Sequence, residues 1–154
     1  MANKKITDLT ALTLAASDDY LEIVDTSATA SKKISRENLV GWHFLTTPLT
    51  STSWDGDSKG TGERATVDLS AVFGVPAGVK AVLISVQTQA DTANDWIGFG
   101  STGMSGFAVV CYTQVSGQNM ITSGIVPCDA NGDIYCYPSG TIENVTLRIW
   151  GYFL

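Results

Sequence analysis

The single histidine of the chain, His43, is the first candidate for a general base, and it is flanked by Trp42, Phe44 and Leu45. General acid–base catalysis requires a side chain that the fold places within reach of a reacting group. No serine or cysteine in a recognisable nucleophile motif accompanies this histidine. A histidine among aromatic residues at a domain junction usually packs, so we predict that His43 has a structural role.

A second candidate is the segment Asp129-Ala130-Asn131-Gly132-Asp133, which has oxygen-bearing side chains at alternate positions. Hard oxygen ligands at such spacing suit Ca²⁺, but an EF-hand loop has glycine at position six and a bidentate glutamate at position twelve. Here the glycine is fourth, and position twelve is Gly140. An Asn-Gly pair is typical of a type I′ hairpin turn, so we predict a tight turn between two strands and no metal site.

The remaining acidic residues support no specific chemistry. Asp55-Gly56-Asp57 is a weaker metal candidate than the Asn-Gly segment. A glycosidase needs two carboxyl groups that the fold brings together, and the sequence singles out no such pair. The sequence therefore predicts no catalytic, cofactor-binding or metal-binding residue.

Three cysteines, Cys111, Cys128 and Cys136, are an odd number without CxxC spacing. This pattern argues against a disulfide framework and against a structural zinc site. Buried free thiols are the preferred interpretation, because free cysteine behaves as a small hydrophobic residue. A Cys128–Cys136 disulfide across a hairpin is the alternative.

Aromatic residues are frequent in the second half of the chain, where exposed rings could stack on sugars. Packing in the core and between subunits is the default interpretation of such residues. They are Trp96, Phe99, Phe107, Tyr112, Tyr135, Tyr137, Trp150, Tyr152 and Phe153.

Composition and charge exclude several classes of protein. Hydrophobic residues make up 44% of the chain, which is enough for a core, but charged residues make up only 16%. The net charge is −6, and the lysine and arginine excess that nucleic-acid binding needs is absent. The run from Trp96 to Cys128 contains no charged side chain, but polar residues interrupt it too often for a membrane span. The N-terminus, MANKKITDLT, lacks the apolar segment of a signal peptide, so we expect synthesis and folding in the cytoplasm.

Residues 1–42 form a small first part with sparse apolar clusters. The runs Tyr20–Asp25 and Ser31–Ser35 predict a hairpin, and Ser35 is placed to cap a short helix over Arg36–Gly41. So little apolar surface does not support an independent core, so we expect residues 1–42 to pack against another domain or protein. Residues 43–64, rich in Ser, Thr, Gly and Asp, predict a connector.

Residues 65–154 predict a domain of many short strands separated by turn residues, with no convincing helix. This pattern is typical of an antiparallel β-sandwich, and we expect the jelly-roll type. The expected strands are Ala65–Leu69, Val79–Gln89, Trp96–Phe99, Phe107–Thr113, Met120–Pro127, Ile134–Tyr137 and Ile142–Phe153.

Two segments resemble known proteins. The stretch KKITDLTALTLAASDDYLEIVDTSATASKKISRENL resembles the particle-docking segment at the start of many tailed-bacteriophage fibre and spike proteins. The stretches ATVDLSAVFGVPAGVKAVLISVQ and LRIWGYFL resemble the β-sandwich head domains of phage virion proteins. The chain lacks the repetitive shaft, collagen-like run or heptad array of a long tail fibre, which favours a short spike, a head-decoration protein or a compact fibre tip.

The resemblance implies a non-catalytic homotrimer on the virion surface. Residues 1–42 would attach to other virion proteins of the capsid or tail, and the sandwich would lie outermost, where it could bind host surface glycans. No nucleic-acid partner and no membrane insertion are expected. The main alternative is a free-standing carbohydrate-binding sandwich module, and a minimal glycan-cleaving spike is a third interpretation.

Overall fold

The computed structural model describes residues 20–23, 32–35 and 41–154. The chain divides into two compact units, residues 1–40 and 41–154. In the first unit, β1 (Tyr20–Ile23) and β2 (Lys32–Ser35) pair antiparallel, as the sequence predicts. The helix expected at Arg36–Gly41 falls mainly on residues 36–40, which lie outside the described part of the chain.

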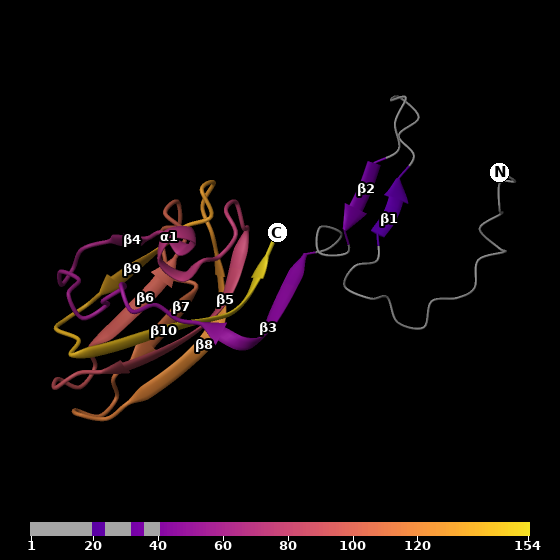
Figure 1. Ribbon diagram of the computed structural model, residues 1–154. Coiled ribbons are helices and arrows are strands. Elements are labelled where there is room, and N and C mark those ends of the chain that lie inside the picture. The colour runs from indigo at the N-terminus through magenta and orange to yellow at the C-terminus, as the bar shows by residue number, and fades with distance from the viewer. Residues whose placement is uncertain (1–19, 24–31, 36–40) are drawn as a thin grey trace, which may run out of the picture. The chain divides into compact units, whose positions relative to one another are not determined.

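The second unit is a sandwich of two antiparallel four-stranded sheets (Figure 1). The first sheet has the order β3-β10-β5-β8 and the second has the order β4-β9-β6-β7. The predicted β-sandwich is thus confirmed, and the ends of the seven predicted strands shift by at most two residues. The strands are β3 (Trp42–Leu49), β4 (Ala65–Val67), β5 (Ala81–Gln89), β6 (Trp96–Gly100), β7 (Val109–Tyr112), β8 (Met120–Pro127), β9 (Ile134–Pro138) and β10 (Asn144–Phe153).

The pairing of these strands is nested along the chain. The first strand pairs with the last, β3 with β10, and the next pairs inward are β4 with β9, β5 with β8 and β6 with β7. A long antiparallel ribbon that is rolled into two sheets gives this order, which is the jelly-roll arrangement. At one side, β7 and β8 close the sandwich, because a Cβ on Gly124 of β8 would lie 2.7 Å from the Val109 side chain of β7.

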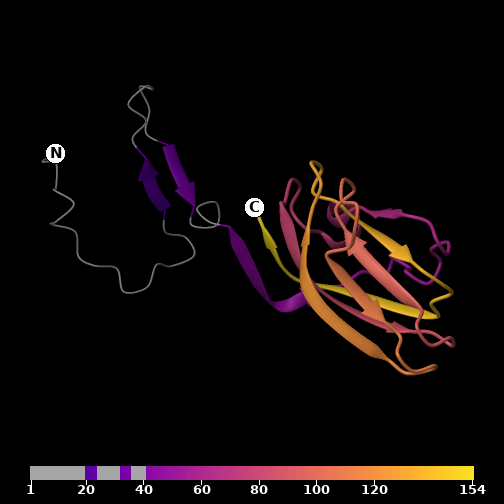
Figure 2. The same ribbon diagram turned by 180° about the vertical axis from the view of Figure 1, so that it is seen from behind.

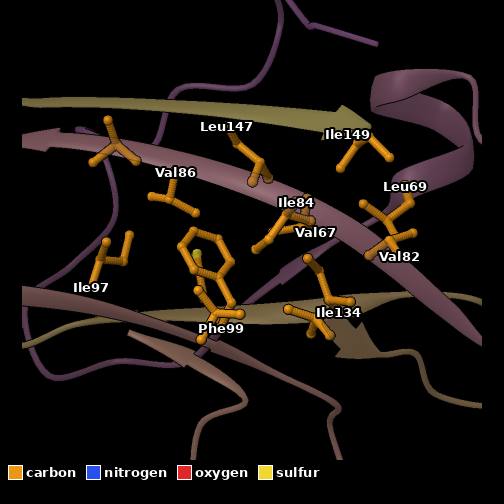
Figure 3. Close-up of a cluster of buried hydrophobic side chains, with 14 of the residues drawn as sticks. Val67, Leu69, Val82, Ile84, Val86, Ile97, Phe99, Ile134, Leu147 and Ile149 are labelled. Atoms are coloured by element: carbon orange, nitrogen blue, oxygen red, sulfur yellow. The ribbon is translucent and has the colours of Figure 1, made fainter. Parts of the chain in front are cut away.

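The core lies between the two sheets. Alternate residues of each strand point inward, as the period of two in a β-strand requires. Figure 3 shows Ile84 and Leu147 of the first sheet facing Phe99 and Ile134 of the second. Strands β5, β6, β9 and β10 supply most of the fully buried side chains, which include Val82, Ile84, Val86, Ile97, Phe99, Ile134 and Ile149.

The connector predicted for residues 43–64 is wrong in its first part, because Trp42–Leu49 forms β3 of the first sheet. The unit therefore begins at Gly41 and not at residue 65. Pro48 gives the physical reason for the error: proline argues against a central strand but is tolerated in an edge strand. β3 is such an edge strand, paired on one side only with β10.

A short helix, α1 (Leu69–Phe73), also departs from the expectation of no helix after residue 42. The Asp68 side chain accepts a hydrogen bond from the Ala71 N–H at 2.9 Å and so caps its N-terminus. Gly74 ends it in the left-handed region, with φ 71°. In the described part of the chain, no helix is both long and apolar enough to cross a membrane.

Candidate functional site

His43 lies on β3, and its ring stacks on the Tyr152 ring of β10 with 5.1 Å between ring centroids. Its Nε2 is buried and has no hydrogen-bond partner among the described residues. No serine, cysteine or carboxylate is hydrogen-bonded to it there. The stack of the His43 ring on Tyr152 fits the predicted packing role.

The Asp129–Asp133 segment forms a corner that carries the chain from β8 in the first sheet to β9 in the second. The prediction of a type I′ hairpin is wrong on two counts. β8 and β9 do not pair, and Gly132 has a positive φ (89°) but Asn131 does not. The Gly132 N–H donates to the Asp129 carbonyl, and the Asp129 N–H donates to the Asp133 carbonyl. This is the pattern of a tight turn followed by one left-handed glycine.

The carboxylates of this corner accept hydrogen bonds from backbone N–H groups. Asp129 accepts hydrogen bonds from the N–H groups of Asn131 and Asp133 at 2.9 Å, and from the Thr102 hydroxyl at 3.0 Å. Burial favours a raised pKa for Asp129, but these hydrogen bonds outweigh it and lower the pKa. Asp133 accepts from the Leu69 N–H at the start of α1. Both side chains therefore hold the corner together.

The Asp55–Asp57 loop is also held by its own carboxylates. Asp55 accepts hydrogen bonds from the N–H groups of Asp57 and Ser58, and Asp57 accepts from the Val145 N–H of β10. Burial raises the pKa of Asp57, although the bond from Val145 opposes the shift. Over residues 20–23, 32–35 and 41–154, no three His, Cys, Asp or Glu side chains are grouped to hold a metal ion.

The three cysteines are free thiols, so the alternative Cys128–Cys136 disulfide is not formed. Cys111 and Cys136 are buried, as predicted, and Cys128 is half-buried. Burial raises the pKa of Cys128 to about 12 and that of Cys136 to about 11. Both thiols are therefore protonated at neutral pH and unsuited to nucleophilic chemistry.

A cluster of rings covers the outer face of the second sheet. We call Trp96, Phe107, Tyr112, Tyr135 and Tyr137 the aromatic patch. Trp96 is its centre, with its ring centroid 5.0 Å from that of Phe107, 5.6 Å from that of Tyr137 and 6.1 Å from that of Tyr112. Tyr112 is 52% exposed, whereas Tyr135 is 1% exposed.

The patch is built on a glycine in the middle of β6. A Cβ on Gly98 would lie 2.5 Å from the Phe107 ring, so the missing side chain leaves the space that this ring fills. The loop between β6 and β7 folds back over the sheet, and the Tyr135 hydroxyl donates to the Gly106 carbonyl at 2.7 Å. The Arg64 guanidinium lies over the Tyr135 ring, 4.6 Å from its centroid.

The first sheet presents a different outer surface. We call Phe44, Leu83, Ile121, Ile125 and Trp150 the apolar face. Phe44 is 72% exposed, Ile121 is 64% and Ile125 is 52%. Leu83 of β5 pairs with Ile125 of β8, so these side chains share one side of the sheet. Figure 2 shows β8, the long orange strand, at the edge of this sheet.

Trp150 lies on the same surface at a β-bulge. The register of β10 shifts between Ile149 and Gly151, which leaves Trp150 unpaired between them. Its indole Nε1 donates to the Ser85 hydroxyl on the outer side of β5, at 3.1 Å. A bulge re-aims a side chain, and here it lays the indole across the sheet.

Charge is almost absent from both sheets. Strands β3 to β10 contain one charged side chain, that of Arg148 on the first sheet. All nine acidic residues of residues 41–154 lie outside these strands. The sandwich therefore combines two faces that carry a single charge between them, that of Arg148, with acidic loops.

The aromatic residues singled out in the sequence divide among three environments. Five form the aromatic patch, Trp150 and Phe153 lie on the outer side of the first sheet, Phe99 is in the core, and Tyr152 packs against the core. Phe44 was not among the predicted residues, because its segment was assigned to the connector. Gly98 and Arg64 were not predicted either, although a glycine inside a strand is a known signal that another group approaches closely.

No family model matches the chain, and no curated protein is significantly similar to it.

Proposed function

We propose that the chain is a non-catalytic structural protein of a tailed-bacteriophage virion, assembled as a homotrimer on the particle surface. Residues 1–42 dock to capsid or tail proteins, and the sandwich faces outward. The protein is made in the host cytoplasm and resides in the virion. The observation that carries the proposal is the apolar face, and the sequence resemblance supplies the virion context.

The exposure of the apolar face supports its role as an interaction surface. Monomeric soluble proteins rarely expose contiguous apolar patches of this kind, and such patches mark interaction surfaces. Burying one isoleucine or phenylalanine side chain contributes about 1.5–3 kcal/mol. Phe44, Ile121 and Ile125 are each more than half exposed, so covering all three contributes roughly twice that amount.

A second copy of the chain is the partner that the charges favour. The sandwich carries four basic and nine acidic residues, so two copies repel each other at most approaches. The first sheet, like the second, has no acidic residue in its strands, so two copies can meet there without opposing carboxylates. Its outer side carries a single charge, that of Arg148, and a low charge density is typical of the core of a subunit interface.

The test is the mass in solution. Size-exclusion chromatography with light scattering at micromolar concentration should give about three times the 16.3 kDa chain mass. The double variant Ile121→Lys/Ile125→Lys places two charges on the apolar face and should give a folded monomer. Val115→Lys is the matched control, because Val115 is 57% exposed but lies in the loop between β7 and β8.

Two results would contradict the proposal: a monomeric wild-type chain, or a double variant that keeps the wild-type mass. Docking is tested separately by deleting residues 1–40, which ends the deletion before the sandwich begins at Gly41. The truncated chain should keep its β-type circular dichroism and fail to enter particles. Normal incorporation would place the attachment elsewhere.

A free-standing carbohydrate-binding module is the second candidate function. The aromatic patch favours it, since exposed rings on a rigid sheet recur in recognition sites. This candidate requires no oligomer, so a monomer that binds saccharide would favour it over the virion proposal.

A further inference from the structure

We propose that the aromatic patch binds a neutral saccharide through its Trp96 and Tyr112 rings. The inference deepens the proposed function and rests on it, because assembly through the apolar face leaves the opposite sheet free to meet a host surface. Three observations support it: the exposure and order of the rings, their hydroxyl groups and the charge around them.

The rings form a fixed platform with one open side. Tyr112 pairs with Trp96 across β7 and β6, and Tyr112 is 52% exposed while Trp96 is half-buried. Phe107 and Tyr137 brace the other sides of the indole. A platform that is ordered before binding loses little entropy when a ligand arrives. The Trp96 and Tyr112 ring planes are inclined at 46°, so a sugar can lay a flat C–H face on one ring and meet the other at an angle.

The patch also offers polar groups at its rim. The hydroxyls of Tyr112 and Tyr137 make no hydrogen bond to another residue in the described part of the chain, whereas that of Tyr135 is used by the Gly106 carbonyl. Each hydroxyl can donate one hydrogen bond and accept others. Rings that combine an apolar body with a polar tip suit a ligand with C–H faces and hydroxyl edges. An aliphatic protein surface, in contrast, fits the apolar face of the first sheet better than it fits the aromatic patch.

The charges select a neutral sugar. Strands β4, β6, β7 and β9 contain no charged residue, and the sandwich as a whole is acidic. One cation on the patch, Arg64, is stacked on Tyr135 and donates to the Met104 carbonyl at 3.3 Å. An anionic saccharide therefore finds this guanidinium already engaged and meets the repulsive field of an acidic domain.

The experiment is saturation-transfer NMR on the full chain. The probes are lactose, maltose, N,N′-diacetylchitobiose and methyl mannoside, each at about 10 mM, which detects millimolar dissociation constants. Sialyllactose serves as the anionic counterpart of lactose. We expect transfer from the protein to at least one neutral probe, and weaker transfer to sialyllactose than to lactose if lactose is the ligand.

Variants locate the binding. Tyr112→Ala should weaken binding by about three- to tenfold, as expected from the loss of one stacked ring. Tyr112→Phe keeps the ring and should lose less, and Val115→Ala should bind as the wild type does. The inference is overturned if no neutral probe receives saturation, or if Tyr112→Ala binds as tightly as the wild type.

The outcome is separable from that of the proposed function. A trimer that binds no neutral probe keeps the proposed function and removes this inference. A monomer whose binding depends on Tyr112 keeps the inference and moves the function to the carbohydrate-binding alternative. The Ile121→Lys/Ile125→Lys variant should keep its saccharide binding, because its substitutions lie on the other sheet.

Discussion

The two outer faces of the sandwich have the same strand chemistry inside and different chemistry outside. Both sheets bury alternate aliphatic residues, and both have almost no charge. On the second sheet the outward rings pack on one another, so Tyr135 is 1% exposed. On the first sheet the outward side chains lie largely uncovered, with Ile121 64% exposed. The rings of the second sheet partly cover one another, whereas the outward aliphatic side chains of the first sheet are largely exposed.

The difference comes from what lies over each sheet. The loop between β6 and β7 returns across the second sheet and delivers Phe107 onto Gly98. The β5–β8 surface of the first sheet instead has Ile121 and Ile125 on the same side of its edge strand, with Ser123 between them. The two outer surfaces therefore differ because a loop of the same chain packs on only one of them.

The largest effect that separates the faces is on the concentration dependence of thermal unfolding. If the apolar face joins three copies, a tenfold dilution should lower the wild-type Tm by about 3 °C. The Ile121→Lys/Ile125→Lys variant should have a lower Tm that does not change on dilution. Differential scanning fluorimetry over two decades of concentration checks both expectations. A wild-type Tm independent of concentration would mean that neither face joins copies.

The corner between the two sheets is the next most sensitive position. Gly132 has a φ of 89°, and a Cβ there would lie 2.9 Å from the Gly78 backbone nitrogen. Gly132→Val should therefore lower the free energy of unfolding by about 2–4 kcal/mol, through strain and crowding together. Gly117→Val separates backbone strain from crowding, since Gly117 has a φ of 70° but no atom within 4 Å of its Cβ position. Equal losses in urea denaturation would show that crowding is unimportant at Gly132.

A smaller loss of stability is expected from substitution of Gly98, on which the aromatic patch is built. Gly98→Ala should cost about 1–2 kcal/mol, because its methyl group displaces the Phe107 ring from the sheet. It should also shift the tryptophan fluorescence, since Phe107 contacts Trp96. Gly103→Ala is the control in the same loop, with open space at its Cβ position. A Gly98→Ala chain as stable as the control would show that the patch is loosely packed.

The strands of the sandwich were predictable because their signal is local. A period of two in β-branched residues, broken by Gly, Asn, Asp and Pro, located seven strands to within two residues. The edge strand β3 was missed because it was read together with the following segment, which is rich in Ser, Thr, Gly and Asp, and Pro48 is a further signal against a strand until its place at the sheet edge is known. The helix α1 was predictable in principle, since Asp68 precedes it and Gly74 and Pro76 follow it.

The surfaces were not predictable to the same degree, because they depend on contacts between distant parts of the chain. The sequence shows that Trp96 and Tyr112 are aromatic, but only their register brings them together across β6 and β7. The corner between β8 and β9 was mispredicted for the opposite reason, because its local signal was clear but misleading. Asn131-Gly132 is the local signature of a hairpin, yet β8 and β9 belong to different sheets. A jelly roll moves the chain between sheets at such turns, and the local signal does not distinguish the two uses.

The cap of α1 gives a smaller effect still, with a defined pH dependence. Hydrogen bonds from the Ala71 N–H and the Ser70 hydroxyl lower the pKa of Asp68 below its unfolded value near 3.8. A lowered folded pKa gives stability that is present above the unfolded pKa and is lost as the pH falls through the folded one. Asp68→Asn keeps a capping oxygen without a charge, so the advantage of the wild type over this variant should shrink below pH 4. Melting curves of both chains from pH 7 to pH 2 check this, and a constant difference would contradict it.

The smallest expected effect, no change at all, concerns the acidic residues of the corner between the sheets. Asp129 already accepts three hydrogen bonds, and Asp133 accepts one from Leu69. Burial, joined by repulsion from Asp68 and Asp129, raises the pKa of Asp133, although the bond from Leu69 opposes the shift. A bound Ca²⁺ would instead lower the pKa of Asp133, since a cation favours the ionised carboxylate.

Calcium or a chelator should therefore leave the Tm of the full chain unchanged. Asp133→Asn should also be close to neutral, because an amide oxygen can still accept from the Leu69 N–H and a repelled charge is removed. The sign of its pH dependence is a further check. A raised folded pKa gives stability that is lost as the pH rises through it, so Asp133→Asn should gain on the wild type as the pH rises from below the unfolded pKa near 3.8 through the raised folded pKa. If a chelator lowered the Tm by several degrees and calcium restored it, the corner would be a metal site, and the same substitution would destabilise the chain at neutral pH.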